Sequence, residues 1–71
     1  MATEITAHIA GTVWKVLKGT GDPVGVGDEV VILESMKMEV PVEAAVAGTI
    51  REVRCSEGDA VAEGDVLAVV D

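Results

Sequence analysis

The sequence contains one internal repeat with a period of 37 residues, and the two copies align without a gap. Residues 2–34 correspond to residues 39–71, so only Ser35-Met36-Lys37-Met38 lies outside the match. Glycines, aspartates and apolar positions all keep the same register, which indicates a duplicated structural unit. The clearest matches pair Ala10-Gly11-Thr12-Val13 with Ala47-Gly48-Thr49-Ile50, Gly21-Asp22 with Gly58-Asp59, and Gly27-Asp28 with Gly64-Asp65.

Each copy has the pattern of a short series of β-strands. Ile5, Ala7 and Ile9 alternate with polar neighbours, as in a half-buried strand. Fourteen valines favour extended structure, and no stretch places apolar residues at helical spacing. Further strands are expected around residues 12–18 and 49–54. About four strands per copy predict an all-β fold, a flattened barrel or sandwich with quasi-twofold symmetry, in which the two copies pack on each other.

The joint between the copies is predicted to form a hairpin over residues 35–38, with Lys37 near its apex. By periodicity alone, residues 29–42 would pass for one strand of 14 residues, well over the usual length of about five or six. The duplication requires the chain to turn at the joint instead. This turn has no Gly, Asn, Asp or Pro at its centre, which indicates that something other than local folding selected its residues.

Composition excludes several classes of function. A chain of 71 residues with a net charge of −8 and one aromatic residue, Trp14, is unsuited to binding nucleic acid or anionic membranes. The single cysteine, Cys55, fits a reducing, cytoplasmic location, and with His8 as the only histidine no metal site is predicted. We expect His8 to lie on a strand and Cys55 near a strand end. Trp14 is expected to add core bulk or cap the barrel, with contact to a partner as the alternative.

Lys37 allows several interpretations from residue type alone. It could be a solvated charge at a hairpin tip, or, in a straight segment, it could lie between two core methionines, Met36 and Met38. The predicted hairpin instead exposes both methionines as an adaptable apolar patch for a partner. A catalytic amine needs burial or nearby cations, whereas Glu34 and Glu39 favour the charged ammonium form. We therefore predict that Lys37 is modified by another enzyme, and we predict no catalytic residue.

The segment Glu34-Ser35-Met36-Lys37-Met38-Glu39 resembles the attachment sequence of biotinyl domains, in which Met-Lys-Met surrounds the biotinylated lysine. The likeness covers essentially the whole chain, including the Gly-Thr elements at 11–13 and 48–50 and the Glu-Gly-Asp turns at 57–59 and 63–65. The sequence is similar to the biotinyl/lipoyl attachment domains, and within them to small stand-alone biotin carboxyl carrier proteins.

This resemblance implies one carrier domain over residues 1–71, with two four-stranded antiparallel sheets and Lys37 on a protruding hairpin. A biotin protein ligase would join biotin covalently to Lys37, recognising Met36, Met38 and Glu34. The biotin arm would carry an activated carboxyl group from a biotin carboxylase to a carboxyltransferase, and tethering keeps it concentrated at both sites. The chain itself would be a cytoplasmic, monomeric carrier subunit of a carboxylase and not an enzyme.

Two departures from the family limit the comparison with acetyl-CoA carboxylase carrier subunits. Residues 18–22 leave no room for the thumb-like insertion of some of them, and their long Pro/Ala-rich N-terminal extension is missing. A piece of a multidomain carboxylase would look similar. The sequence also leaves open the final carboxyl acceptor, which could be an acyl-CoA, pyruvate, urea or another substrate.

Two alternative functions share the predicted hairpin. A lipoyl carrier has the same fold and a hairpin lysine, but its tip is usually Asp-Lys-Ala, whereas this chain has Met36-Lys37-Met38. An unmodified docking module would bind a partner directly through the exposed methionines. Replacing Lys37 separates the two classes, because a carrier would lose all function and a docking module would keep most of its affinity.

Overall fold

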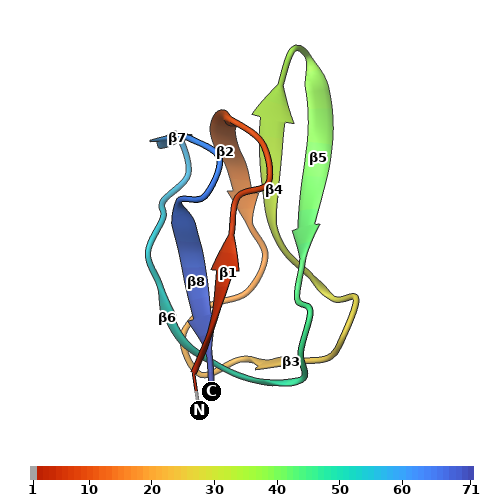
Figure 1. Cartoon of the computed structure of the whole chain (residues 1–71), viewed down its shortest axis with the longest axis vertical. Helices are drawn as coiled ribbons and strands as arrows, with labels where there is room; N and C mark the ends of the chain where they lie inside the picture. The colour runs from red at the N-terminus through yellow and green to blue at the C-terminus, as the bar shows by residue number, and fades with distance from the viewer. Residues whose placement is uncertain (1) are drawn as a thin grey trace.

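The computed structural model describes residues 2–71, which form eight β-strands joined by turns (Figure 1). The strands are β1 (Thr3–Thr6), β2 (Gly11–Val16), β3 (Pro23–Val24), β4 (Glu29–Ser35), β5 (Met38–Glu43), β6 (Gly48–Val53), β7 (Ala60–Val61) and β8 (Val66–Val70). They make two four-stranded antiparallel sheets. We call the sheet with order β1-β8-β6-β3 the terminal sheet, and the sheet with order β5-β4-β2-β7 the hairpin sheet. The predicted all-β fold class is confirmed.

The two sheets are related by the 37-residue repeat, and each sheet takes two strands from each copy. The shift converts β1, β2, β3 and β4 into β5, β6, β7 and β8, and so converts one strand order into the other. The register repeats as well: Leu33 pairs with Val40 in the hairpin sheet, and Val70 pairs with Thr3 at the corresponding place in the terminal sheet. The copies are therefore interleaved, which joins them more closely than packing one copy on the other.

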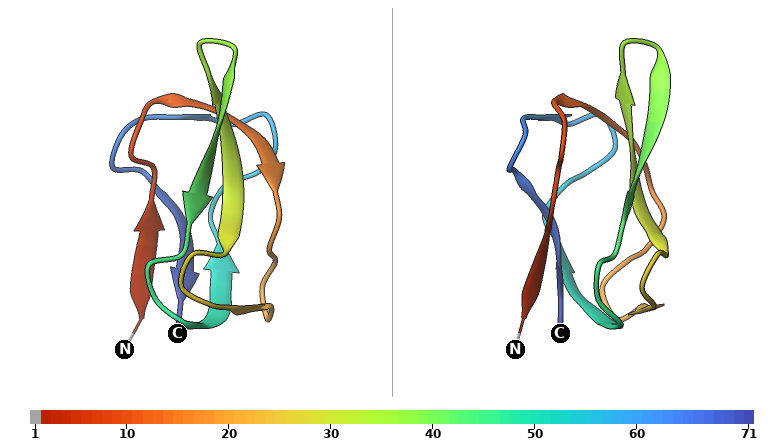
Figure 2. Two further views of the ribbon diagram at one scale, coloured as in Figure 1. Left: turned by 90° about the vertical axis from the view of Figure 1, so that its right-hand side faces the viewer. Right: turned by 45° about the vertical axis from the view of Figure 1, so that its right-hand side comes forward.

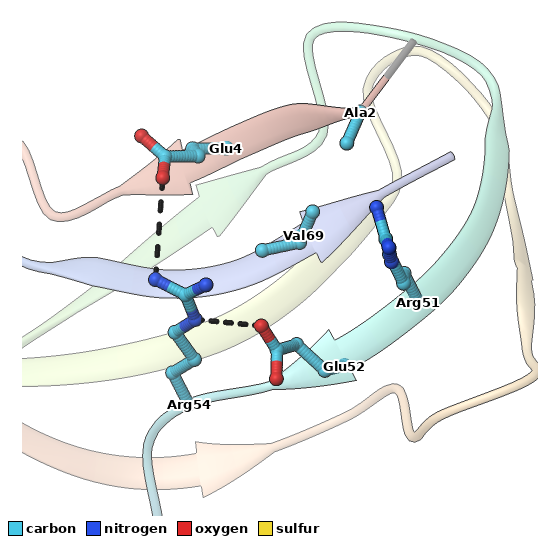
Figure 3. Close-up of a pocket in the computed structure, with 6 residues that line it drawn as sticks. All are labelled: Ala2, Glu4, Arg51, Glu52, Arg54 and Val69. Atoms are coloured by element: carbon cyan, nitrogen blue, oxygen red, sulfur yellow. Dashed lines mark hydrogen bonds and ion pairs between the residues drawn. The ribbon is translucent and has the colours of Figure 1, made fainter.

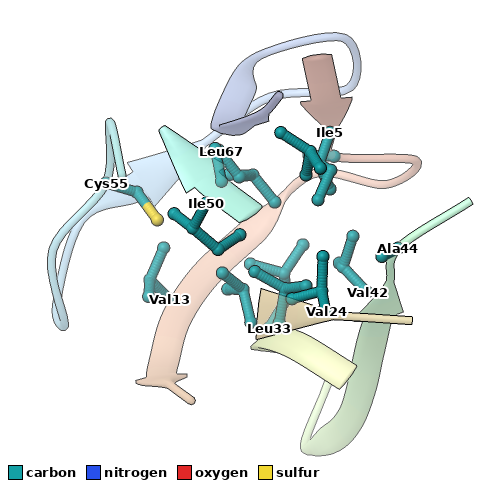
Figure 4. Close-up of a cluster of buried hydrophobic side chains, with 14 residues drawn as sticks. Ile5, Val13, Val24, Leu33, Val42, Ala44, Ile50, Cys55 and Leu67 are labelled. Atoms are coloured by element: carbon teal, nitrogen blue, oxygen red, sulfur yellow. The ribbon is translucent and has the colours of Figure 1, made fainter. Parts of the chain in front are cut away.

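The core lies between the sheets and is built from small aliphatic side chains (Figure 4). Burial of each such side chain contributes about 1.5–3 kcal/mol, so many of them replace the aromatic residues that the chain lacks. Cys55, just after β6, joins this core, as expected for a residue near a strand end. The largest fully buried side chains are Leu33, Ile50, Leu67, Val13, Val30, Val31 and Val70.

Four aspartates hold the turns between strands, and their positions explain the repeated Gly-Asp pairs. Each carboxylate accepts a hydrogen bond from the backbone N–H three residues earlier, for example Gly19 N–H to Asp22 Oδ2 at 2.7 Å. The glycine before each aspartate has a positive φ of 89–93°, which glycine adopts without steric cost. The four pairs are Gly21-Asp22, Gly27-Asp28, Gly58-Asp59 and Gly64-Asp65.

Two expectations about single residues are wrong. Trp14 does not supply core bulk; it is 41% exposed on the hairpin sheet. Trp14 follows the inward-facing Val13 on β2, so the alternation along the strand points it outward, and a β-bulge between Val13 and Lys15 leaves both Trp14 and Lys15 on the exposed face. His8 does not lie on a strand either, because β1 ends at Thr6 and His8 is exposed in the bend that follows.

The molecule is elongated, with extents of 33 × 17 × 17 Å. The β4–β5 hairpin projects beyond the body of the two sheets, and the two ends of the chain lie together at the opposite end (Figure 2). Between residues 2 and 71 the chain forms no helix of the length and apolarity needed to span a membrane.

Candidate functional site

The β4–β5 hairpin turns at Met36 and Lys37, which both have positive φ, 52° and 66°. Below them the ladder is regular, with Ser35 paired to Met38 and Glu34 paired to Glu39. Positive φ at both central residues is typical of a type I′ hairpin turn, which usually contains Asn and Gly. The left-handed conformation costs about 1–2 kcal/mol for an ordinary residue. The paired strands therefore hold the tip in a conformation that its own residues disfavour.

The tip presents its side chains to solvent. Met36 is 93% exposed and Met38 is 65% exposed, and Lys37 is exposed between them. The ion pairs found between residues 2 and 71 all involve Arg51 or Arg54, so none of them occupies the Lys37 amine. The hairpin thus offers one accessible primary amine flanked by two flexible apolar groups.

Two carboxylates mark the base of the tip. Glu34 and Glu39 lie directly opposite each other on β4 and β5, and both are exposed. Like charges at directly opposed positions of a sheet are destabilising, so the fold gains nothing from this pair. The structure brings the predicted residues Glu34, Met36, Lys37 and Met38 together on one hairpin, with Glu39 beside them.

Sequence reasoning missed the contribution of Gly11 to this site. The repeat indicates a bend or a close backbone approach at Gly11 and Gly48, but it does not say which of the two occurs or what approaches them. A Cβ atom on Gly11 would lie 2.7 Å from the carbonyl oxygen of Glu34 and 3.5 Å from the Cβ of Ser35. Gly11 therefore allows β2 to pass directly beside the base of the hairpin. Gly48 makes the same approach to Asp71, the counterpart of Glu34.

The geometry of the hairpin fits the covalent attachment of a carrier group. Attachment through an amide needs an amine that another protein can reach, and Lys37 provides one on a projecting, well-paired ribbon. Within the described chain, no three His, Cys, Asp or Glu side chains are grouped so that they could hold a metal ion. The arrangement can present a group to an enzyme, and the exposed methionines can be recognised by it.

Comparison with known families agrees with this geometry. Residues 1–70 match the biotin/lipoyl family model, which is described as "Biotin-requiring enzyme". The chain belongs to the biotin/lipoyl attachment family. A relative in this family, "Biotinylated protein TB7.3" of Mycobacterium tuberculosis, is 50% identical over 44 residues. These residues are 62% of this chain and 62% of that relative, so the match spans less than two thirds of the relative's length.

Solved structures of biotin/lipoyl attachment domains have the same fold. The urea carboxylase of Kluyveromyces lactis contains a segment with a TM-score of 0.94 and 35% identity, which covers 100% of this chain and 6% of that chain. The lipoyl domain of the 2-oxoglutarate dehydrogenase complex from Azotobacter vinelandii has a TM-score of 0.73 and 32% identity, and covers 87% of this chain and 78% of that chain. A segment of a carboxylase and a lipoyl domain therefore both share the backbone fold described above.

Proposed function

We propose that residues 1–71 form one biotin carboxyl carrier domain, with biotin attached covalently to the Nζ atom of Lys37. The observation that carries this proposal is the exposed Met36-Lys37-Met38 tip on a projecting hairpin, in which Met36 and Lys37 have positive φ. Membership in the biotin/lipoyl family supports it. The relative that is itself named a biotinylated protein favours biotin as the attached group.

In this proposal, the chain's own residues bind and orient, and they catalyse nothing. Attachment forms one amide bond between the Lys37 Nζ and the carboxyl carbon of biotin, which a biotin protein ligase has activated with ATP as an acyl adenylate; the bond to the adenylate oxygen breaks, AMP leaves, and the amine loses a proton. Met36 and Met38 give the ligase an apolar surface beside the amine. Glu34, at the base of the tip, adds a charge that the ligase can recognise.

Bound biotin supplies the chemistry, because it accepts a carboxyl group at one active site and gives it up at another. The chain holds this arm on a rigid ribbon, and tethering keeps the arm at high effective concentration at both sites. The partners that we infer are a biotin protein ligase, a biotin carboxylase and a carboxyltransferase. We also infer a cytoplasmic location and a monomeric state, since the lone Cys55 fits a reducing compartment and a carrier must leave each site.

A lipoyl carrier is the second candidate, and the structural likeness to the Azotobacter vinelandii lipoyl domain is the observation that favours it. Its weakness lies at the tip. Both methionines that flank Lys37 are exposed, so a ligase that binds the hairpin can contact their apolar side chains. In this proposal, the apolar Met-Lys-Met tip directs the protein to a biotin ligase and away from a lipoyl ligase.

Transfer of a labelled carboxyl group tests the carrier role directly. The biotinylated protein is incubated with a purified biotin carboxylase, ATP and labelled bicarbonate, beside a Lys37→Arg variant taken through the same steps. We expect acid-labile label on the wild-type protein and none on the variant. A wild-type protein that stays unlabelled, while the same enzyme still carboxylates free biotin, would contradict the carrier role.

A further inference from the structure

The duplication allows the outer faces of the two sheets to be compared position by position, because the 37-residue shift relates their strands in the same register. The outer face of the terminal sheet has a shallow hollow lined by Ala2, Glu4, Arg51, Glu52, Arg54 and Val69 (Figure 3). The corresponding residues of the hairpin sheet are Glu39, Pro41, Trp14, Lys15, Leu17 and Ile32. We call the four apolar members, Trp14, Leu17, Ile32 and Pro41, the Trp14 patch.

On the outer face of the terminal sheet, the charged side chains form ion pairs with one another. The Arg54 Nε lies 2.7 Å from Glu52 Oε1, and the Arg54 Nη1 lies 4.0 Å from Glu4 Oε2 (Figure 3). Arg51 Nη1 lies 3.7 Å from Asp71 Oδ1. Every charged side chain that lines this hollow thus has an opposite charge nearby, and the face needs no partner.

The hairpin sheet leaves the same positions apolar and open. Trp14 is 41% exposed and Leu17 is 43% exposed, Pro41 is exposed, and Ile32 is half-buried. The β-bulge that places Trp14 recurs at Arg51, its counterpart, so both side chains leave equivalent points of the backbone. Lys15 places its Nζ 5.3 Å from the centroid of the Trp14 ring and leaves the rest of the patch uncovered.

The fold does not require apolar residues at these positions. The terminal sheet has the same strand order, register and bulge with Arg51 in place of Trp14 and Arg54 in place of Leu17. Trp14 and Leu17 each leave about two fifths of their surface in water, and contact with a partner would remove that apolar area from water. Large exposed apolar groups that the fold does not need mark interaction surfaces, and tryptophan is enriched among the residues that dominate binding energy.

We propose that the Trp14 patch is the surface on which the biotin protein ligase docks when it modifies Lys37. This proposal rests on the proposed function. Strand β4 runs from Ile32 in the patch to Ser35 at the base of the tip, a distance of about 10 Å for three residues at about 3.3 Å each. A protein whose active site receives the Lys37 amine is thus within reach of this face of the same ribbon. The patch extends the contact that the hairpin tip begins.

The charges around the patch define the partner's surface. Glu29, Glu34, Glu39 and Glu43 flank it on β4 and β5, and none of the ion pairs formed by residues 2–71 includes them. A complementary surface has an apolar centre and a basic rim. A second copy of this chain would place the same glutamates against one another, so self-association through this face is disfavoured.

Kinetics of biotinylation test the proposal. The probe is the biotin protein ligase of Mycobacterium tuberculosis, an organism that biotinylates a relative. Initial rates are measured over a range of protein concentrations for wild type and for a Trp14→Thr/Leu17→Thr variant. The matched control is Arg51→Thr/Arg54→Thr, which changes the equivalent positions of the other sheet. We expect the KM to rise about tenfold for the patch variant, with kcat retained, because truncating a central apolar anchor costs more than about 1 kcal/mol.

Thermal unfolding of each variant shows whether the fold is retained, and Pro41→Glu provides a second patch variant if the double variant unfolds. The counterpart of Pro41 is Glu4, so the backbone accepts glutamate there. The Pro41→Glu variant is also expected to raise the KM. Unchanged KM in folded patch variants overturns the proposal, as does an equal rise in the control or a fall in kcat alone. Normal biotinylation with impaired carboxylation would overturn the ligase assignment, whereas a wild-type protein that is never biotinylated would contradict the proposed function itself.

Discussion

At the scale of single residues, the hairpin tip combines two features that folding alone disfavours. Met36 and Lys37 adopt positive φ without being Gly or Asn. The side chain of Met36 is almost fully exposed, and that of Met38 is largely exposed. The turn could be predicted only because the repeat leaves residues 35–38 unmatched, since the residues themselves carry no turn signal. Their backbone conformation could not be predicted, because it is imposed by the pairing of β4 with β5.

Replacing Met36 should separate the stability of the tip from its recognition. Met36→Asn puts a residue that tolerates positive φ at this position, and we expect the free energy of unfolding to rise by about 0.5–1 kcal/mol. The same change removes an exposed thioether, so biotinylation should slow. Met36→Leu is the control, because it keeps an apolar side chain and the strained φ. Urea unfolding and ligase kinetics measure the two effects; an equal rate for all three proteins would contradict the role of Met36.

Cys55 should make stability depend on pH in alkaline solution. Burial raises the pKa of its thiol, and the negative charge of Asp59 raises it further. The unfolded chain then loses the thiol proton at a lower pH than the folded protein does. The free energy of unfolding should therefore fall as the pH rises above about 8.5, the ordinary thiol value. Urea unfolding between neutral and alkaline pH should show this slope for wild type and a weaker one for Cys55→Ala; parallel profiles would contradict it.

At the scale of the strands, glycines at the starts of β2 and β6 set how closely neighbouring segments approach. The equivalent places of Gly11 and Gly48 in the repeat predicted a bend or a close backbone approach at each. It could not predict that Gly11 lies against Glu34, because contacts between strands distant in the chain are not encoded in local pattern. The bulges at Trp14 and Arg51 escaped prediction for the same reason.

Replacing these two glycines should distinguish a general loss of stability from damage to the site. A methyl group on Gly11 would press on the Glu34 backbone, and one on Gly48 would press on the Asp71 backbone. Such overpacking costs about 1–3 kcal/mol, and each kcal/mol lowers the Tm by roughly 4–8 °C in a domain of this size. We expect both Gly11→Ala and Gly48→Ala to lower the Tm. Only Gly11→Ala should also slow biotinylation, since Gly48 lies at the opposite end; equal rates for the two variants would contradict this.

At the scale of the whole molecule, the duplication predicted the fold class and its symmetry, because every glycine turn and apolar alternation occurs twice. It did not predict the strand order, in which each sheet mixes the two copies. Two arrangements are consistent with the same pattern of buried residues: two separate halves that pack on each other, and two halves that exchange strands. The shift by 37 residues relates the β4–β5 pair to the β8–β1 pair, and the β4–β5 hairpin projects beyond the two sheets at one end of the molecule (Figure 2).

The proposed carrier function depends most directly on Lys37 being the one residue that receives biotin. The intact mass of the protein should be measured after co-expression with a biotin protein ligase, with biotin and lipoate both supplied, beside a Lys37→Ala control. We predict a single biotinyl addition to the wild-type protein and no addition to the control. A lipoyl addition at Lys37 would move the protein to a dehydrogenase-type complex, and no addition to a folded wild-type protein would contradict the carrier function.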